Sequence, residues 1–583
     1  MQEQAPLLTE VSGGTSIVFK NKELYSRHAP RQRAEERAGG FSLEANTLYI
    51  LASPLLWYGV PRLLEQLPPS AHIIAVEIEP QLVELSRRYV RPELTRHHRL
   101  HICFQESSAN SASASSNASS NTSTGQGTAP LEAVKAVLDQ LGIEQFRRAR
   151  LITLNGGYRL NSRRYSEIHQ LLEEEIHQFW QNKYTLMHML PLWIKNIFRN
   201  YAEWAGDGAA RRVRFGLPHT TLPVMVAGAG PSLEQHLEFL QQHRSRFYLL
   251  AVDTAYSTLL ASGIHPDLVV VQESQFYNLY DFLGHPRLDC NLLADISSYP
   301  RVLRLAGEHG SRSTVFLYAS EFAKVSLLDK LRSADLLPPL FPPLGSVGTT
   351  AVRAALHISG SAVIIAGLDF AFPAGKTHSN GTPRHQLALL HTNRLQGIED
   401  MSARSTKGVT PVPGRTDSFG EQLLSTPTLR RYADNFTRIF QSMERMHMLK
   451  PAGLPLGIAG LTQADLSRYL LALEPPPGKA AASAPTLAEK AGPGAVKAFL
   501  SKERERLVWI YKRGTGFLQG ELTADEAALL TEEINRCEYL FLHFPETGYT
   551  LRKVDPTLMK RLLVSTGHYI RVIDEALELI PRS

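Results

Sequence analysis

Between Pro223 and Phe372 the chain alternates short apolar runs with longer segments of helical period, and this alternation constrains the fold more than any other feature. The runs of strand length are Val224–Ala227, Tyr248–Val252, Leu268–Val271, Thr314–Tyr318 and Ala362–Ala366. Strands that alternate with helices favour a mostly parallel sheet with helices on both faces. Ligands of such sheets bind beyond the carboxyl ends of the strands, so the residues after each run are the candidates for a site.

A second α/β unit is predicted near the N-terminus. Thr47–Ala52 and His72–Ile78 have strand length, and the segment between them has the pattern of a turn and a helix. Glu77 and Glu79 lie where a Rossmann-like domain would place an acid for a ribose. However, Ser53-Pro54 stands where such a domain has glycines, so the sequence favours a scaffold without a ligand.

At 583 residues the chain is too long for one hydrophobic core, and several domains are expected. Residues 161–222 carry apolar residues at helical period on both sides of Pro191, which predicts two connecting helices. The predicted division is a Rossmann-like domain at 1–160 with a Ser/Asn-rich insertion at 107–127, connecting helices at 161–222, a catalytic α/β domain at 223–474, a Pro/Gly/Ala-rich linker at 475–495 and a helical domain at 496–583.

Composition narrows the class of protein. Hydrophobic residues make up 43% and charged residues 20%, as in ordinary soluble domains. The net charge of +6 is spread along the chain, which does not favour a nucleic-acid partner. No secretion signal or membrane-spanning segment is recognisable, so a cytoplasmic protein is expected. The three cysteines have no zinc-binding spacing, and no metal site is expected.

The run Val224–Ala227 leads into Gly228, Gly230, Pro231 and Ser232 and then into a helix-like segment. A helix start leaves backbone N–H groups unpaired and carries partial positive charge, and glycine lets an anion come close. The junction therefore predicts a phosphate site. The alternative is a strand-to-helix turn that binds nothing.

Small residues recur at Gly345, Ser346, Val347 and Gly348, again at the start of a helical pattern. They predict a second contact for an anion, and the alternative is that small residues allow helices to pack closely.

Polar residues follow two other strands of the predicted central sheet. Asp253 and Thr254 come after Tyr248–Val252, and Glu273 comes after Leu268–Val271. All are expected at the rim of the ligand site. Asp253 could accept a hydrogen bond from a ribose or a base, and its equally weighted alternative is to cap the next helix.

An acid and an imidazole follow the strand Ala362–Ala366. Asp369 lies three residues beyond it, and His378 lies in the Gly-rich loop after that. Histidine has an ordinary pKa near neutrality, so His378 is predicted to be a general base, with a surface histidine as the alternative.

Five segments taken together, in this order and spacing, resemble the motility-associated factor family. They are Ala227-Gly-Ala-Gly-Pro-Ser-Leu233, Asp253-Thr-Ala255 followed by Leu259–Asp267, Gly345-Ser-Val-Gly348, Ala366-Gly-Leu-Asp-Phe-Ala371 and Thr377-His-Ser-Asn-Gly381. The N-terminal segment Tyr25-Ser-Arg-His-Ala-Pro30 adds to the likeness, which covers about four-fifths of the chain. The family has a Rossmann-like N-terminal domain and a sialyltransferase-like central domain. It is implicated in transferring nonulosonic acids, such as pseudaminic or legionaminic acid, from CMP donors to Ser or Thr of flagellin.

The resemblance implies a role for each motif. Gly228, Gly230 and Ser232 would hold the phosphate side of the nucleotide, Asp253 and Thr254 the cytidine or ribose, and Gly345 to Gly348 would complete the donor pocket. Asp369 and His378 would line the reacting end. The essential histidine of related sialyltransferases lies farther from its strand, so His385 and His391 are rivals to His378. Gln272-Glu273 stands where relatives commonly have an Asp, so the chain departs from the family at the sugar contacts.

The function expected from these observations is glycosyl transfer from a CMP-sugar to flagellin, without a further cofactor. Because no Asp-x-Asp pair is present, metal independence is expected. The resemblance leaves two alternatives: a pterin-type diphosphokinase using ATP and magnesium, and a non-catalytic chaperone that binds flagellin. Whether the chain forms a homo-oligomer is left open.

Overall fold

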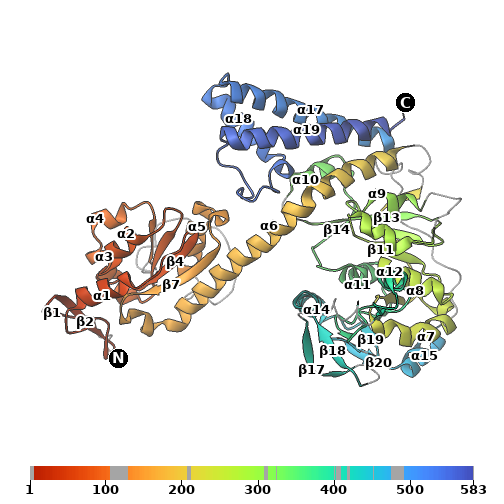
Figure 1. Ribbon diagram of the computed structural model, residues 1–583, viewed down its shortest axis with the longest axis horizontal. Coiled ribbons are helices and arrows are strands. Elements are labelled where there is room, and N and C mark those ends of the chain that lie inside the picture. Colours follow the sequence, from red (N-terminus) through yellow and green to blue (C-terminus); the bar gives the residue numbers. More distant parts are fainter. Residues whose placement is uncertain are drawn as a thin grey trace, which may run out of the picture. The chain divides into compact units, whose positions relative to one another are not determined.

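The computed structural model describes residues 5–104, 129–206, 212–285, 287–306, 313–322, 325–398, 401, 409–416, 420–450, 452–473 and 492–581. The predicted insertion at 107–127 and most of the predicted linker lie outside these residues. The chain divides into two compact units, Met1–His188 with Leu542–Thr550 and Met189–Phe541 with Leu551–Ser583 (Figure 1). We describe each unit by itself. The finer division into five segments stays a prediction.

Unit 1 is built on a parallel sheet of four strands in the order β6-β5-β4-β7. The strands are β4 (Thr47–Ala52), β5 (His72–Glu77), β6 (Leu100–Phe104) and β7 (Arg148–Thr153). The helices are α1 (Pro30–Gly39), α2 (Val60–Gln66), α3 (Pro80–Tyr89), α4 (Pro92–Thr95) and α5 (Ala129–Leu141). β4 and β5 pair in parallel, with Leu48 opposite His72, which confirms the predicted strand–helix–strand arrangement.

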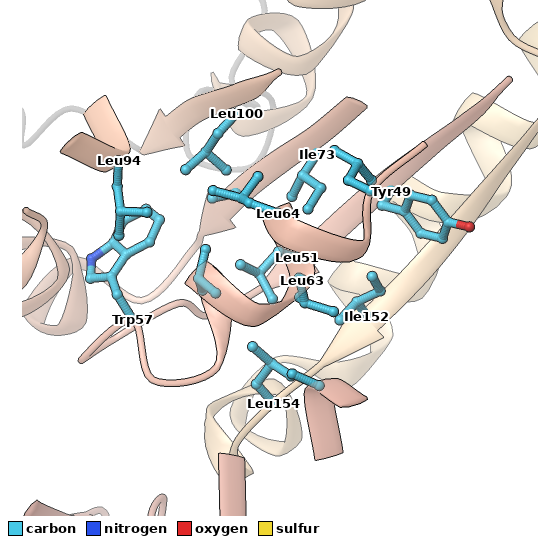
Figure 2. Close-up of a cluster of buried hydrophobic side chains, with 14 of the residues drawn as sticks. Tyr49, Leu51, Trp57, Leu63, Leu64, Ile73, Leu94, Leu100, Ile152 and Leu154 are labelled. Carbon is cyan, nitrogen blue, oxygen red and sulfur yellow. The ribbon is translucent and has the colours of Figure 1, made fainter. Parts of the chain in front are cut away.

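Both faces of this sheet are covered, because alternate side chains of each strand belong to different cores. Leu51 and Ile73 pack under Leu63 of α2 on one face (Figure 2). Ile50 and Ile74 pack with another group that includes Phe146. A small antiparallel sheet precedes the parallel sheet in the chain and was not predicted from the sequence. Its strands are β1 (Leu7–Val11), β2 (Gly14–Phe19) and β3 (Lys22–Glu23).

A single helix, α6 (Ser162–Ala205), replaces the two predicted connecting helices, so that prediction is wrong. Pro191 lies inside this helix although it lacks an N–H group. Leu186, Leu190 and Ile194 are all buried at a spacing of four residues, so the apolar stripe stays in register across the proline. Burial of this stripe offsets the lost hydrogen bond. The helix contributes its first part to unit 1 and its last part to unit 2.

The segment Leu542–Thr550 belongs to unit 1 although the chain on both sides of it belongs to unit 2. Lys183 of α6 explains this attachment. Its buried ammonium donates to the carbonyl oxygen of Thr547 at 2.6 Å and to the hydroxyl of the same residue at 3.1 Å.

Unit 2 contains a sheet of ten strands in which every pair is parallel, which confirms the predicted mostly parallel sheet. The order is β14-β13-β12-β11-β10-β9-β15-β19-β20, and β8 pairs with β13. The strands are β8 (Val213–Phe215), β9 (Val224–Ala227), β10 (Tyr248–Val252), β11 (Leu268–Val271), β12 (Asn291–Asp295), β13 (Val315–Ser320), β14 (Leu340–Phe341), β15 (Val363–Ala366), β19 (Met446–Leu449) and β20 (Ala459–Leu461).

The strand order determines where a site can form. β9 lies between β10, the next strand in the chain, and β15, which comes much later. The chain therefore leaves β9 and β15 side by side, at the end of the sheet where the strands have their carboxyl ends. This reversal of the connections is where open α/β sheets bind ligands.

Helices and a small antiparallel sheet complete unit 2. Helix α11 (Val347–Ile358) packs against β9, β10, β11 and β15. The antiparallel sheet has the order β16-β18-β17. The remaining elements are α7 (Leu237–Gln242), α8 (Tyr256–Ala261), α9 (Pro300–Arg304), α10 (Ser326–Ser333), α12 (Pro383–His391), α14 (Pro427–Phe440), α15 (Gln463–Ala472), β16 (Phe372–Pro373), β17 (Thr410–Thr416) and β18 (Gln422–Ser425).

The C-terminal region of unit 2 is helical, as predicted. It contains α17 (Gly492–Gln519), α18 (Ala524–Asn535) and α19 (Pro556–Glu578), and α17 and α19 lie side by side (Figure 1). The first residues of α17 fall inside the predicted linker. Buried Glu503 of α17 joins this region to α10, because its carboxylate accepts a hydrogen bond from Lys330 of α10 at 2.6 Å. The same carboxylate accepts from the hydroxyl of Tyr539, after α18, at 2.6 Å. Among the described residues, no helix combines the length and the apolar character needed to cross a membrane.

Candidate functional site

A cavity of about 680 Å³ opens in unit 2 where the chain leaves β9 and β15. Its walls come from the 3₁₀ turn η4 (Pro231–His236), from the loop after β16 and from α12. Three predicted site residues line it, namely Ser232, Asp369 and His378, and so does the rival His385. The structure therefore brings together residues from two distant parts of the sequence.

Ser232 and Asp369 are bonded to each other in this wall. The backbone N–H of Ser232 donates to Oδ2 of Asp369 at 2.9 Å, and its hydroxyl donates to Oδ1 at 2.5 Å. Burial raises the pKa of the Asp369 carboxyl, and the two hydrogen bonds from Ser232 oppose that rise. The Ser232 N–H that the sequence predicted for a phosphate thus donates to the protein's own carboxylate, and a phosphate site at this turn stays a prediction.

The glycines of the β9 loop allow the two strand exits to approach closely. A Cβ atom at Gly228 would lie 2.3 Å from the carbonyl oxygen of Gly367. A Cβ atom at Gly230 would lie 2.4 Å from Oδ2 of Asp369. Both positions therefore require glycine for packing against the β15 exit, whether or not a nucleotide also binds there.

His378 lies in the loop that closes the other side of the cavity. Its Nδ1 is 3.1 Å from the hydroxyl of Thr377. Burial, together with the positive charge of Arg384, lowers the pKa of His378 to about 4. The imidazole is therefore neutral near pH 7 and has the protonation state of a base.

The two rival histidines differ in their surroundings. Nδ1 of His385 accepts a hydrogen bond from the N–H of Gly381 at 3.2 Å, so its proton is on Nε2 when the ring is neutral. His391 is exposed at the end of α12 and does not line the cavity. Of the three candidates, His378 and His385 have access to the cavity.

Two charged residues of the cavity wall, Glu234 and Lys376, were missed by the sequence reasoning. Nζ of Lys376 lies 2.6 Å from Oε2 of Glu234. The other carboxylate oxygen of Glu234 accepts from the N–H of Asn380. Arg384, also missed, lines the same cavity. No motif singles these residues out, because their proximity depends on how the loop folds over η4.

A second polar group lies at the exit of β10. Oδ1 of Asp253 accepts from the N–H of Thr254 at 2.8 Å, and Oδ2 accepts from the Asn278 amide at 2.7 Å. The same amide donates to Asp281 at 3.1 Å. Burial raises the pKa of both carboxyl groups, and the negative charge of Asp253 adds to the rise for Asp281. The sequence did not predict Asn278 or Asp281.

The remaining predicted residues surround the start of α11. Ser346 caps this helix, because its Oγ accepts from the N–H of Thr349 at 3.2 Å. A Cβ atom at Gly348 would lie 2.4 Å from a methyl carbon of Leu368, so a larger residue there would displace that side chain. Gln272 accepts from Thr350 at 2.9 Å, whereas its neighbour Glu273 is exposed.

The predicted donor residues after β10 and β11 and at α11 do not line the cavity that holds His378. Their roles toward a nucleotide stay predictions. Among the described residues, no group of three or more His, Cys, Asp and Glu side chains could hold a metal ion.

Comparison with known proteins relates the chain to a family model and to a solved structure. The model of the family described as MptE-like, 6-hydroxymethylpterin diphosphokinase MptE-like, matches residues 195–375. The solved structure of a MAf glycosyltransferase from Magnetospirillum magneticum AMB-1 is similar over 99% of this chain and 92% of that chain, with a TM-score of 0.53 and 16% sequence identity. At that identity the likeness shows the fold. It is the fold that the resemblance to motility-associated factors predicted.

Sequence relatives extend the comparison. An uncharacterized protein of Treponema pallidum (strain Nichols) is 26% identical over 454 residues, which are 77% of this chain and 73% of that protein. Another uncharacterized protein of the same organism is 28% identical over 178 residues, 29% of this chain and 45% of that protein.

Proposed function

We propose that this chain is a glycosyltransferase that moves a nonulosonic acid, such as pseudaminic or legionaminic acid, from a CMP donor to Ser or Thr of flagellin. The observation that carries this proposal is the cavity at the reversal of the strand order, which His378 lines together with the bonded Ser232–Asp369 pair. The likeness of nearly the whole chain to a MAf glycosyltransferase fold supports it.

His378 supplies the base that the reaction needs. A hydroxyl that attacks an oxocarbenium-like sugar becomes strongly acidic as the new C–O bond forms. A weakly basic imidazole can therefore take its proton, provided that it is neutral when the hydroxyl arrives. The burial that lowers the pKa of His378 keeps it in this state.

The departing CMP requires stabilisation of its phosphate. The N–H groups of Val347 and Gly348 open the twelve-residue helix α11, and the structure gives them no partner among the described residues. Such groups, together with the helix dipole, suit an anion. We propose that Gly345 to Gly348 complete the donor pocket at this helix start, and that the bond that breaks lies in the cavity beside Ser232 and Asp369.

The test is a transfer reaction with purified components. The chain is incubated with flagellin and with CMP-activated pseudaminic or legionaminic acid, and the mass of intact flagellin is measured. We expect the mass to rise by one or more sugar residues, and no rise when the donor is replaced by CMP. An unchanged mass with every donor, together with equal binding of flagellin with and without donor, would instead support the chaperone alternative.

The match of residues 195–375 to the pterin diphosphokinase family favours a second candidate function. This reaction would transfer diphosphate from ATP to the hydroxymethyl group of a pterin. Calorimetry separates the candidates. Tight binding of ATP with magnesium, without heat from CMP in the presence or absence of chelator, would overturn the glycosyltransferase proposal in favour of the kinase.

A further inference from the structure

The turn η4 makes two separate connections to the walls of the cavity. Ser232 binds Asp369, as described above, and Glu234, two residues later, reaches the loop that carries His378. We propose that Glu234 is a positioning residue that holds the loop 375–381, and with it His378, in place for proton transfer. This inference rests on the proposed function.

The two oxygens of the Glu234 carboxylate contact residues on both sides of His378. Oε2 binds Nζ of Lys376 at 2.6 Å, two positions before the histidine. Oε1 accepts from the N–H of Asn380, two positions after it. One side chain therefore fixes both flanks of the imidazole.

Other contacts of this loop lie on the C-terminal side of His378. The N–H of Ser379 donates to the carbonyl oxygen of Ala229 at 3.0 Å, and the hydroxyl of Thr258 donates to the carbonyl oxygen of Asn380 at 2.8 Å. Lys376 bonds through its backbone to Pro373 within its own turn. The link from Glu234 to Lys376 thus ties the N-terminal side of the loop to the β9 exit.

The geometry suits a positioning role. The side chains of Lys376 and Glu234 are 35% and 27% exposed, so their pairing is partly shielded from water. A charged acceptor strengthens each hydrogen bond it receives. Displacement of a reacting group by about 1 Å can cost roughly 100-fold in rate. Because Ser232 and Glu234 share one short turn, η4 sets the positions of Asp369 and His378 relative to each other.

Hydrogen exchange tests the contact without depending on activity. We expect amides of residues 375–381 to exchange about tenfold faster in Glu234→Ala than in the native chain. Glu238→Ala is the matched control. Glu238 lies in α7 and contacts Gln242 on the surface, so its loss should leave this loop unchanged. Unchanged exchange in Glu234→Ala would overturn the inference.

Kinetics then separates a positioning role from a merely structural one. Glu234→Ala should lower kcat about 10- to 100-fold with little change in KM. Glu234→Gln should recover part of that loss, because its amide oxygen can still accept from Asn380. Lys376→Met should fall between the native chain and Glu234→Ala. A faster-exchanging loop with native kcat would overturn the inference.

The pH profile gives a further readout. The charged and titratable groups around His378 are Arg384 and His385 on α12, Lys376 on its own loop, Glu234 on η4, and Asp369 and Glu421 across the cavity. Glu234→Ala and Glu234→Gln lose the same negative charge, so their pH profiles differ through the loosened loop. A loosened loop hydrates the imidazole, so the acidic limb of kcat/KM should lie at higher pH in Glu234→Ala than in Glu234→Gln. Identical limbs in the two variants contradict the inference. If the native chain transfers no sugar, the proposed function fails, and the exchange experiment still decides whether Glu234 holds the loop.

Discussion

Both units contain a parallel sheet with small and acidic residues after the carboxyl ends of its strands. The surroundings of these residues differ between the two units. In unit 1 the buried Glu77 carboxylate accepts from Ser53 at 2.6 Å and from Tyr165 at 3.2 Å. Asn155 donates to the carbonyl oxygen of Ser53 at 2.8 Å and so extends the network to the exit of β7. In unit 2 the carboxyl ends of the strands border a cavity, which Ser232 and Asp369 line.

The loop after β4 explains this difference. Ser53, Leu55 and Trp57 all have positive φ, which non-glycine residues seldom adopt, and all three are buried. The chain folds its own side chains into the space where a nucleotide-binding loop would leave room. The loop after β9 has glycines instead. The two sheets therefore differ in the loops at the ends of their strands rather than in the strands themselves.

The largest expected effect concerns the cavity of unit 2. His378→Ala should lower sugar transfer by roughly 10²- to 10⁴-fold, the usual contribution of a general base. His391→Ala, at an exposed residue outside the cavity, should transfer at the native rate. Both are measured from the mass of flagellin over time. Near-native transfer by His378→Ala would remove this histidine from the site.

The buried Glu77 of unit 1 should make the free energy of unfolding depend on pH. Burial raises the pKa of Glu77 from its ordinary value of 4.5 to about 7. The folded chain therefore binds more protons than the unfolded chain between these values. The stabilisation is complete below pH 4.5 and is lost as the pH rises through 7, a change of roughly 3 kcal/mol.

Glu77→Gln removes this titration while keeping the size of the side chain. Its amide can donate to Ser53 and accept from the neighbouring N–H groups. The dependence on pH between 5 and 8 should therefore decrease in urea unfolding, with sugar transfer unaffected. A variant with the same pH dependence as the native chain would show that Glu77 does not cause it.

A matched pair of glycine substitutions compares the loops at the carboxyl ends of the two sheets directly. A Cβ atom at Gly228 meets the backbone of Gly367 at 2.3 Å, and one at Gly157 meets the hydroxyl of Ser53 at 2.2 Å. Alanine at either position should destabilise the protein by roughly 1–3 kcal/mol through overpacking. Gly228→Ala should also reduce sugar transfer, whereas Gly157→Ala should not. Thermal unfolding and the transfer assay measure these effects, and equal loss of transfer in both would contradict the comparison.

The smallest expected effect concerns Arg384. Its positive charge helps to lower the pKa of His378, but burial is the larger cause. Arg384→Gln should therefore move the acidic limb of kcat/KM to higher pH by only a fraction of a pH unit. Arg394→Gln, at an exposed residue that does not line the cavity, is the control. A shift of the limb toward lower pH in Arg384→Gln would contradict the electrostatic explanation.

Local patterns predicted much of the fold, because a buried strand is apolar wherever it lies in the sheet. Val224–Ala227, Tyr248–Val252 and Leu268–Val271 were predicted with the bounds that β9, β10 and β11 have. β12 was missed, because its apolar core, Leu292–Ala294, is shorter than the other runs. The unbroken α6 was missed because a local rule for proline takes no account of the apolar stripe on both sides.

The site was predictable only in part. Gly-rich loops and a polar residue after a strand indicated Ser232, Asp369 and His378 one at a time. Their grouping depends on β9 pairing with β15, which no local pattern encodes. Glu234 gave no signal, because a glutamate early in a helix is common and its partner, the loop at Lys376, is far away in the chain.

The position of β9 between β10 and β15 has a consequence for biosynthesis. The halves of the cavity wall at Ser232 and Asp369 are 137 residues apart. A nascent chain that has emerged only as far as α11 already contains the first half but cannot yet assemble the pocket. Contacts this distant in sequence form slowly and late. Substrate recognition should therefore appear only when synthesis of unit 2 has passed β15, and a truncation product that ends before it should be inert.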